Sequence, residues 1–173
     1  MTRASHDRTL ILLRHAKAEQ GSGVDAERKL TDRGVRDAKA AGRWIAEHGY
    51  GADEVLCSPA VRTTMTCDAV ATAGCSEAEV RHDRRIYNAS PEALLEVLHD
   101  APEDANVVLL VGHAPGLPSL ASLLADGKGS TIAHEHMSEG FPTSGIAVLS
   151  YAGAWSELGF ADARLERFGV GRG

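Results

Sequence analysis

The hydrophobic pattern of the chain consists of short apolar runs separated by longer stretches in which apolar residues recur at helical spacing. Residues 9–13 and 106–111 are unbroken runs of strand-forming, mainly apolar side chains, which is typical of strands buried on both faces of a sheet. Residues 54–57 predict a third, shorter strand, and residues 79–81 predict a weaker one. Strands that alternate with helices favour a parallel sheet covered on both faces.

The longest predicted helix follows the first strand. Thr31 can cap this helix, which is expected to run to about His48, with Gly49 as its stop. Its apolar positions are near helical spacing and comprise Val35, Ala38, Ala41, Trp44 and Ile45. We expect this helix to lie against the sheet.

Two Ser-Pro pairs mark further helix starts, because serine is a favoured cap and proline is tolerated in the first helical turn. Ser58-Pro59 predicts a helix that reaches about Ala73, with Ser58 as its cap and Arg62 in its first turn. Ser90-Pro91 predicts a helix to about His99. A fourth helix is expected over residues 116–125.

The last third of the chain is more β-like. Its glycines predict a loop over residues 126–130, and the polar residues 134–136 also favour a loop. Strands are predicted at residues 146–151 and 155–159, with a turn at 152–154 between them and a candidate edge strand at 164–168. The fold class predicted from the whole pattern is α/β: a three-layer α/β/α sandwich with a mostly parallel central sheet and antiparallel strands near the C-terminus.

Length and charge narrow the classes of protein to which the chain can belong. A chain of 173 residues with 43% hydrophobic content fits one domain, expected at residues 9–173 after a flexible N-terminal segment at 1–8. The net charge of −6 argues against broad attraction to nucleic acid or to an anionic membrane. Because no stretch resembles a membrane helix or a signal peptide, we expect a cytoplasmic protein, with a monomer as the default.

Cysteine and histidine spacing gives no sign of a disulfide framework or a metal site. Cys57, Cys67 and Cys75 are odd in number and form no CxxC pair. His134-Glu135-His136 places donors on adjacent residues, whose side chains would splay apart in a strand or loop. We therefore expect no functional metal.

Polar side chains follow three of the predicted strands. Arg14 and His15 come after the first strand, Ser58 follows the strand at 54–57 with Arg62 one helical turn further on, and His113 follows the strand at 106–111. In an open α/β sheet, ligands bind in the crevice beyond the carboxyl ends of the strands. We therefore expect these side chains to converge on one crevice.

The residue types in this crevice suit phosphoryl transfer. A phosphoryl group in flight spreads negative charge over its oxygens, and the guanidinium groups of Arg14 and Arg62 offer forked donors for them. The helix start after His113 can add backbone N–H groups and the positive end of a helix dipole. Arginine charge should lower the pKa of a nearby histidine and keep its lone pair free, and His15 is the better candidate nucleophile of the two.

Three segments in order along the chain resemble the histidine phosphatase superfamily, which has a phosphoglycerate mutase-like fold; they are Leu13-Arg14-His15-Ala16, Ser58-Pro59-Ala60-Val61-Arg62 and Gly112-His113-Ala114-Pro115-Gly116. The chain is more closely similar to the small SixA-type phosphohistidine phosphatases of that superfamily. This closer resemblance rests on Arg14 to Lys17, Asp25, Arg28, Leu30-Thr31 and Phe141-Pro142-Thr143.

The resemblance implies a two-step reaction in which His15 takes the phosphoryl group and water then releases phosphate. Arg14, Arg62 and His113 would hold the phosphoryl oxygens, with no metal or other cofactor. Ser58, Ala114, Arg28 and Glu19 are further candidates for substrate binding. Ser58 has the alternative role of a helix cap, and Arg28 that of a surface ion-pair partner.

A general acid is missing from the pattern. Larger members of the superfamily carry a glutamate that protonates the leaving oxygen, whereas Ile86-Tyr87-Asn88 stands near that place here. A phosphorylated imidazole needs such help less than an alkyl phosphate does, so the absence favours a phosphohistidine substrate. Glu19, Asp25 and Asp83 stay open as acids that could reach the site from loops.

Two other functions compete with that of a protein phosphohistidine phosphatase. The same residues could serve a phosphatase for small molecules, such as a sugar phosphate, a nucleotide or a phosphoanhydride. They could also form a phosphate-binding module without catalysis, although the presence of both histidines and both arginines argues against this. Little sequence remains for a substrate-covering lid, and an open site would suit a phosphorylated protein as partner.

Overall fold

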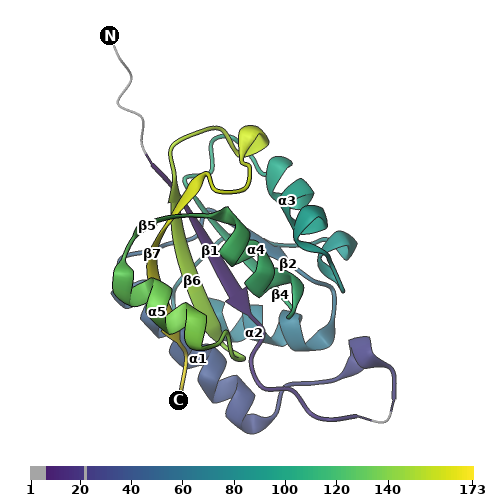
Figure 1. Ribbon diagram of the computed structural model, residues 1–173. Helices are drawn as coiled ribbons and strands as arrows, with labels where there is room; N and C mark the ends of the chain where they lie inside the picture. The colour runs from purple at the N-terminus through teal and green to yellow at the C-terminus, as the bar shows by residue number, and fades with distance from the viewer. Residues whose placement is uncertain (1–6, 22) are drawn as a thin grey trace.

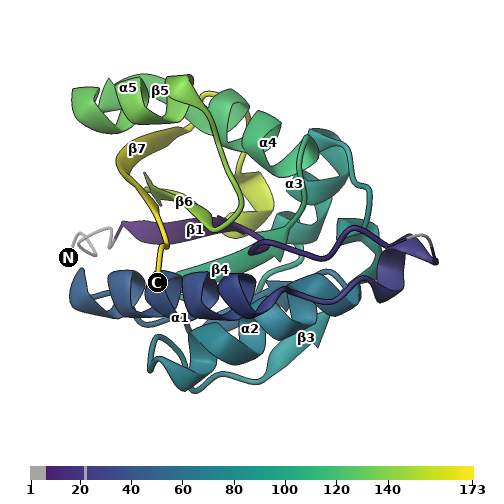
Figure 2. The same cartoon turned by 90° about the horizontal axis from the view of Figure 1, so that it is seen from below.

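A computed structural model of the protein describes residues 7–21 and 23–173, which form a mixed α/β domain (Figures 1 and 2). The strands are β1 (Arg8–Arg14), β2 (Glu54–Cys57), β3 (Val80–His82), β4 (Val107–Gly112), β5 (Ala125–Gly129), β6 (Gly145–Tyr151) and β7 (Ala163–Val170). The α-helices are α1 (Asp32–Glu47), α2 (Val61–Thr72), α3 (Pro91–His99), α4 (Gly116–Leu124) and α5 (Thr131–Glu139). Short 3-10 helices lie at η1 (Asp25–Glu27), η2 (Arg84–Ile86) and η3 (Trp155–Glu157).

The described strands form one seven-stranded sheet in the order β3-β2-β4-β1-β6-β7-β5. β6 runs antiparallel to both of its neighbours, and every other paired strand in the sheet is parallel to its neighbour. Figure 2 shows α1 and α2 on one face of the sheet and α3, α4 and α5 on the other. The predicted three-layer fold, with antiparallel pairing near the C-terminus, is confirmed.

The central strand β1 shows why this sequence folds into three layers. Its side chains alternate between the two faces, as the pleat of a strand requires. Leu10 and Leu12 are buried in the core beneath α3 and α4, whereas Ile11 and Leu13 are buried in the core beneath α1 and α2. An unbroken apolar run is therefore needed at this position, because neither face of β1 meets solvent.

Helix starts follow the predicted caps at two of three positions. Thr31 accepts a hydrogen bond from the Gly34 amide at 3.0 Å, and Ser90 accepts one from the Ala93 amide at 3.2 Å, so α1 and α3 begin as predicted. The prediction that Ser58 caps the second helix and that this helix starts directly after it was wrong. α2 begins at Val61, and the Ser58 hydroxyl accepts from the Ala60 amide at 3.4 Å within the preceding turn.

Four predictions in the last third of the chain were wrong. Residues 126–130, expected as a loop, lie largely in β5, which pairs with β7. The polar residues 134–136 lie in helix α5, and the predicted strand at 155–159 is instead the short helix η3. β7 is flanked by β6 and β5, so it is not an edge strand.

The N-terminal segment predicted at residues 1–8 falls mostly outside the described residues, since residues 1–6 are not among them and β1 begins at Arg8. Over the part of the chain that the structure describes, no helix combines the length and the apolar composition that crossing a bilayer requires. Cys57, Cys67 and Cys75 are buried as free thiols.

Candidate active site

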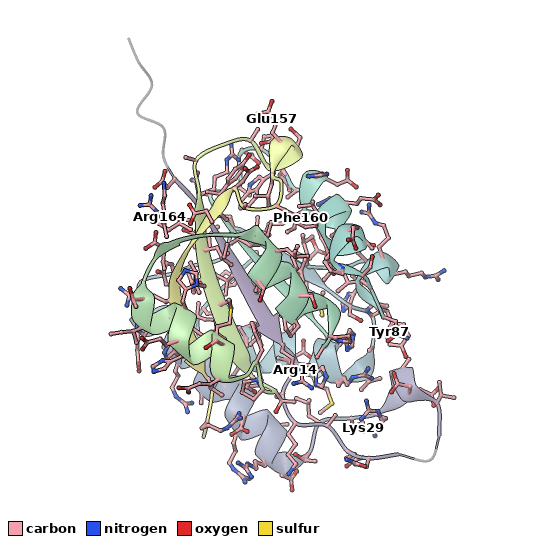
Figure 3. All side chains as sticks on the ribbon, viewed as in Figure 1. Arg14, Lys29, Tyr87, Glu157, Phe160 and Arg164 are labelled. Carbon is pink, nitrogen blue, oxygen red and sulfur yellow. The ribbon has the colours of Figure 1, made fainter. Side chains whose placement is uncertain are left out.

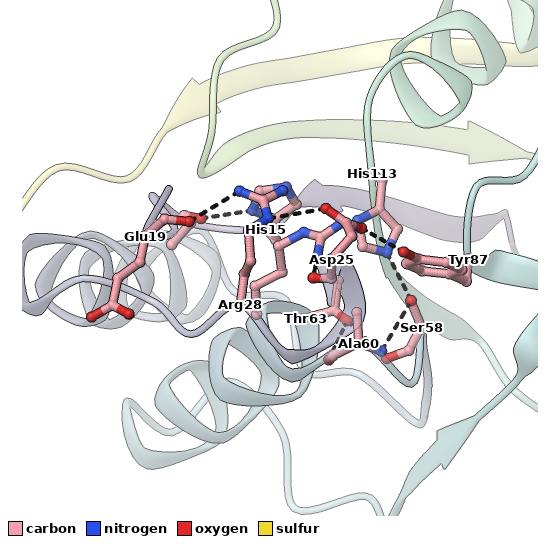
Figure 4. Close-up of polar contacts among 11 residues, drawn as sticks. His15, Glu19, Asp25, Arg28, Ser58, Ala60, Thr63, Tyr87 and His113 are labelled. Atoms are coloured by element: carbon pink, nitrogen blue, oxygen red, sulfur yellow. Dashed lines mark hydrogen bonds and ion pairs between the residues drawn. The ribbon is translucent and has the colours of Figure 1, made fainter. Parts of the chain in front are cut away.

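The sheet brings together the residues that follow β1, β4 and β2. Arg14 at the end of β1 lies opposite Gly112 at the end of β4, and Cys57 at the end of β2 lies opposite Val111. The next residues in each chain segment, His15, His113 and Ser58, therefore leave the same edge of the sheet. Figure 3 shows Arg14 at this end of the molecule, and Figure 4 shows His15, His113 and Ser58 grouped there.

His15 is held in one orientation by a backbone carbonyl. Its ring is buried, with 8% of the residue exposed, and Nδ1 lies 2.7 Å from the carbonyl oxygen of Ala16. Because a carbonyl oxygen only accepts, Nδ1 must carry the proton and donate it. The neutral ring then has its lone pair on Nε2, which is the atom available for attack on phosphorus.

The protonation state of His15 also suits a nucleophile. Burial is the main cause that lowers its pKa to about 4, the hydrogen bond to Ala16 opposes this, and the charges of Arg62 and Arg14 lower the pKa further. The direction agrees with the sequence-based prediction, but that prediction named arginine charge as the cause, whereas desolvation is larger. His15 is therefore neutral near pH 7.

His113 is held through the opposite ring nitrogen. Its Nε2 lies 2.7 Å from the hydroxyl oxygen of Ser58, and its ring centroid lies 5.4 Å from that of His15. The Ser58 hydroxyl accepts from the Ala60 amide, and in one of the two tautomers of His113 it donates its own proton to Nε2. The neutral ring then carries its own proton on Nδ1. Burial first, and then the charge of Arg62, lower the pKa of His113 to about 3.

Arg62 enters the site from the first turn of α2 and is almost fully buried, with 4% exposed. Its two terminal nitrogens donate to residue 25: one to the backbone oxygen of Asp25 at 2.9 Å and the other to the Asp25 carboxylate at 3.0 Å. Thr66, one turn further along α2, accepts from the Ala16 amide at 3.1 Å and donates to the Arg62 carbonyl at 2.7 Å. α2 is thereby tied directly to the segment that carries His15.

Arg14 directly precedes His15 at the end of β1 and is half-buried. Its guanidinium donates to the backbone oxygen of Phe141 at 3.0 Å. The segment after Phe141 also supports the main chain here, because the Ser144 amide lies 3.2 Å from the Arg14 oxygen and 3.1 Å from the His15 oxygen. The Phe141-Pro142-Thr143 segment, one of the segments that resemble the SixA-type proteins, therefore helps to hold Arg14 and His15 in place.

Three buried nitrogens of the site have no hydrogen-bond partner among the described residues: Nε of Arg14, Nε of Arg62 and Nδ1 of His113. Each can donate a proton, and two of them belong to cations. Buried donors without an acceptor are unfavourable unless a ligand supplies one. Three such donors on residues at the ends of β1 and β4 and at the start of α2 fit a phosphoryl group, whose oxygens are strong acceptors.

The remaining predicted residues occupy different places. Arg28 donates to the Asp25 carboxylate at 3.0 Å and to the Glu19 backbone oxygen at 3.1 Å, and its charge is close enough to lower the pKa of both site histidines. The Glu19 carboxylate is exposed and points away from the ring of His15 (Figure 4). Ala114 is exposed between His113 and the start of α4.

Tyr87 is a site residue to which sequence reasoning gave no role. Its ring packs edge-on against His113 with centroids 5.5 Å apart, lies 6.0 Å from the Arg62 guanidinium carbon, and its hydroxyl donates to the Asp25 carboxylate. Close packing holds its segment in place, because a Cβ on Gly116 of α4 would collide with the carbonyl oxygen of Ala89. The only sequence signal was its position near the missing acid.

The sequence profile of the histidine phosphatase superfamily (branch 1) matches residues 10–89 of this chain. The chain is also 39% identical to the uncharacterized protein Rv1276c of Mycobacterium tuberculosis, over 92% of this chain and 100% of that protein. Among solved structures, it is similar to a protein provisionally named phosphohistidine phosphatase SixA from Nakamurella multipartitia, with a TM-score of 0.84, 36% identity, and coverage of 95% and 96% of the two chains. The chain belongs to the histidine phosphatase superfamily.

Two further structures agree with this assignment. A provisionally named phosphohistidine phosphatase SixA from Agrobacterium tumefaciens is 29% identical, with a TM-score of 0.76 and coverage of 94% of this chain and 98% of that one. The protein histidine phosphatase SixA in complex with tungstate has a TM-score of 0.77 at 18% identity, which shows a shared fold. The predictions of a SixA-type histidine phosphatase and of a phosphatase as the enzyme class are confirmed.

Proposed function

We propose that this protein removes phosphate from phosphohistidine in a protein partner, with His15 as the nucleophile. Two structural relatives with 36% and 29% identity carry the provisional name phosphohistidine phosphatase, which supports this substrate class. The observation that carries the proposal is the state of the carboxylates around the site. None of the three that the sequence left open as a general acid combines a position in the site with a proton to donate.

Asp25 lies in the site but is held as an anion. A hydrogen bond from Tyr87, followed by those from Arg62 and Arg28, lowers the pKa of Asp25 to about 2. An acid with this pKa has no proton to give near neutral pH, where a useful general acid has a pKa near the working pH.

Glu19 and Asp83 are engaged elsewhere or turned outward. The Glu19 carboxylate points away from His15 (Figure 4). Both oxygens of the Asp83 carboxylate accept from Arg85, which lowers the pKa of Asp83. A substrate whose leaving group takes no proton from the enzyme therefore fits this site best, and a phosphorylated imidazole that is protonated on its other ring nitrogen has such a leaving group.

The reaction that this geometry supports has two steps. In the first, Nε2 of His15 attacks phosphorus, the bond between phosphorus and the substrate nitrogen breaks, and the substrate ring, which already carries a proton on its other nitrogen, takes the electron pair and leaves as neutral imidazole. In the second, water attacks the phosphorylated His15 and releases inorganic phosphate. The guanidinium groups of Arg14 and Arg62 and the Nδ1–H of His113 would stabilise the charge on the phosphoryl oxygens in both steps, and a metal ion is not required for this role.

The test of this proposal compares leaving groups on the purified protein. Turnover is measured with a phosphohistidine-containing carrier protein, an aryl phosphate and a panel of alkyl phosphates that includes sugar phosphates, with and without a chelator. We expect turnover of the first two, slow turnover of the alkyl panel, and no effect of the chelator. Faster turnover of an alkyl phosphate than of the phosphohistidine protein would refute the proposal and favour a small-molecule phosphatase. Phosphate binding without any turnover, even of the aryl phosphate, would instead indicate a non-catalytic module.

A further inference from the structure

One carboxylate beside the phosphate site collects donors from three separate segments of the chain. Asp25, in η1, accepts from Arg62 of α2, from Arg28 in its own loop, and from the Tyr87 hydroxyl, which follows η2. Figure 4 shows Arg28 and Tyr87 on either side of Asp25, next to the pair of histidines. With half of its side chain exposed, Asp25 is not needed to fill the core, so its three partners require another explanation.

The contacts of Asp25 determine how the Arg62 guanidinium is turned. One terminal nitrogen donates to the Asp25 backbone oxygen at 2.9 Å and the other donates to the Asp25 carboxylate at 3.0 Å. Residue 25 therefore binds both terminal nitrogens of the guanidinium. A guanidinium is planar, and two contacts on its terminal nitrogens fix the plane and the direction of the remaining N–H groups. The buried Nε of Arg62 is left without an acceptor among the described residues.

Tyr87 contacts both members of the pair formed by Asp25 and Arg62. Its ring lies 6.0 Å from the guanidinium carbon of Arg62 while its hydroxyl donates to the same carboxylate oxygen that Arg62 contacts. Arg62 is thus restrained both at its terminal nitrogens and at the side of its plane. Restraint of this kind lowers the entropy that the arginine would otherwise lose when it binds a phosphoryl group.

We propose that Asp25 is a positioning residue for phosphoryl transfer, which holds the Arg62 guanidinium so that its free N–H edge meets the phosphoryl oxygens. The inference rests on the proposed function only in that Arg62 is taken to bind the phosphoryl group; it does not depend on which leaving group the substrate carries. Asp25 itself neither accepts nor donates a proton in the reaction, and it acts only through Arg62.

Asp25 could act in the opposite way, as a carboxylate that blocks phosphate binding, and the two roles predict different results. A carboxylate that occupied the phosphate position would compete with the ligand, and its removal would strengthen phosphate binding. A positioning carboxylate leaves the ligand edge of Arg62 open, and its removal weakens binding. The sign of one measurement therefore separates the two roles.

The experiment compares Asp25→Asn with Glu27→Gln, which removes the same charge from an exposed residue of the same turn. Binding of inorganic phosphate is measured by calorimetry, and kcat and KM are measured with an aryl phosphate. We expect Asp25→Asn to weaken phosphate binding and to lower kcat/KM by about tenfold each, with the larger part of the loss in kcat, because one charge-assisted hydrogen bond to Arg62 is weakened. Glu27→Gln should match the wild type, and melting curves should show both variants folded.

A double-mutant cycle tests whether Asp25 acts through Arg62. In an Arg62→Ala background, Asp25→Asn should cause no further loss of phosphate affinity, because the group that it positions is gone. Tighter phosphate binding by Asp25→Asn, equal behaviour of Asp25→Asn and Glu27→Gln, or a full tenfold loss in the Arg62→Ala background would each overturn the proposal. Failure of the phosphohistidine test alone would leave these phosphate measurements unaffected, so the two proposals can fail separately.

Discussion

The two histidines of the site stand at the ends of adjacent parallel strands and are both buried, yet they are held through opposite ring nitrogens. Nδ1 of His15 donates to a carbonyl oxygen, whereas Nε2 of His113 meets the hydroxyl of Ser58. A carbonyl forces a lone pair onto the far nitrogen of His15, and a hydroxyl that donates leaves a proton on the far nitrogen of His113. The same side chain can therefore serve as a nucleophile at one strand end and as an oxyanion donor at the next.

Replacement of His15 should have the largest effect on activity. His15→Ala removes the proposed nucleophile, so kcat with an aryl phosphate should fall by at least about 10³-fold and no phosphoenzyme should form. Rapid quenching with labelled substrate, followed by phosphopeptide mapping, checks both points. A phosphoenzyme in this variant, or one that maps to His113 in the wild type, would reverse the roles assigned to the two rings.

Replacement of His113 should have a smaller effect, because this variant loses the proposed donor and keeps the proposed nucleophile, His15. His113→Ala should lower kcat by about 10²-fold, as is typical when one oxyanion donor is removed. Burst kinetics should still show a phosphoenzyme at His15, formed and hydrolysed more slowly. Complete absence of the phosphoenzyme would mean that His113 does more than donate a hydrogen bond.

Acid should destabilise the fold through both rings. Their folded-state pKa values are about 4 and about 3, below the unfolded-state value of about 6.5, so protons bind preferentially to the unfolded chain as the pH falls below 6.5. The free energy of unfolding should therefore fall by about 2 kcal/mol per ring between pH 7 and pH 5.

Urea unfolding at several pH values checks this prediction. His15→Gln and His113→Gln should each flatten the curve of unfolding free energy against pH by about 2 kcal/mol over that window. The pKa of Asp25 is lowered to about 2. Its protonation therefore reduces the free energy of unfolding only below about pH 4, which lies outside the window from pH 7 to pH 5. A His15→Gln curve parallel to that of the wild type would show that the pKa of His15 is not lowered by burial.

The smallest effect is expected for the hydroxyl that distinguishes the two rings. Ser58→Ala removes the hydrogen bond to Nε2 of His113 and should lower kcat by about fivefold, which corresponds to about 1 kcal/mol. The control is Ser122→Ala on the exposed side of α4, which should leave kcat unchanged. If Ser58→Ala also left kcat unchanged, the orientation of His113 would not depend on this hydroxyl.

The elements that the sequence predicted well are those with strong local signals. β1 and β4 are unbroken apolar runs, and α1 and α3 have serine or threonine caps whose hydrogen bonds the structure confirms. Because the polar residues follow directly at the strand ends, the convergence of His15, His113 and Ser58 could also be foreseen. The parallel pairing of β1, β4 and β2 in register brings the ends of these strands to the same edge of the sheet.

The elements that were predicted wrongly have weak local signals and are defined by contacts with distant parts of the chain. Helix α5 buries only Ala133, so no apolar stripe marks it. Trp155 is the buried residue of a short 3-10 turn, and it is held there because its backbone amide donates to Glu103 and its indole donates to Ala105, about fifty residues earlier. β5 contains two glycines and becomes a strand only through its pairing with β7.

The order of residues is enough to predict which side chains follow the central strands, since apolar runs and the residues that end them are local features. The chemistry open to those side chains depends on the folded structure. The contact of His113 with Ser58, the burial that lowers both pKa values, and the hydrogen bonds from Arg62 to Asp25 all depend on partners from separate segments. The ring of His15 contacts the carbonyl of the adjacent Ala16, and the folded backbone sets that orientation. Hydrogen bonding and desolvation are set by three-dimensional neighbours, and their effects on protonation cannot be read from residue order alone.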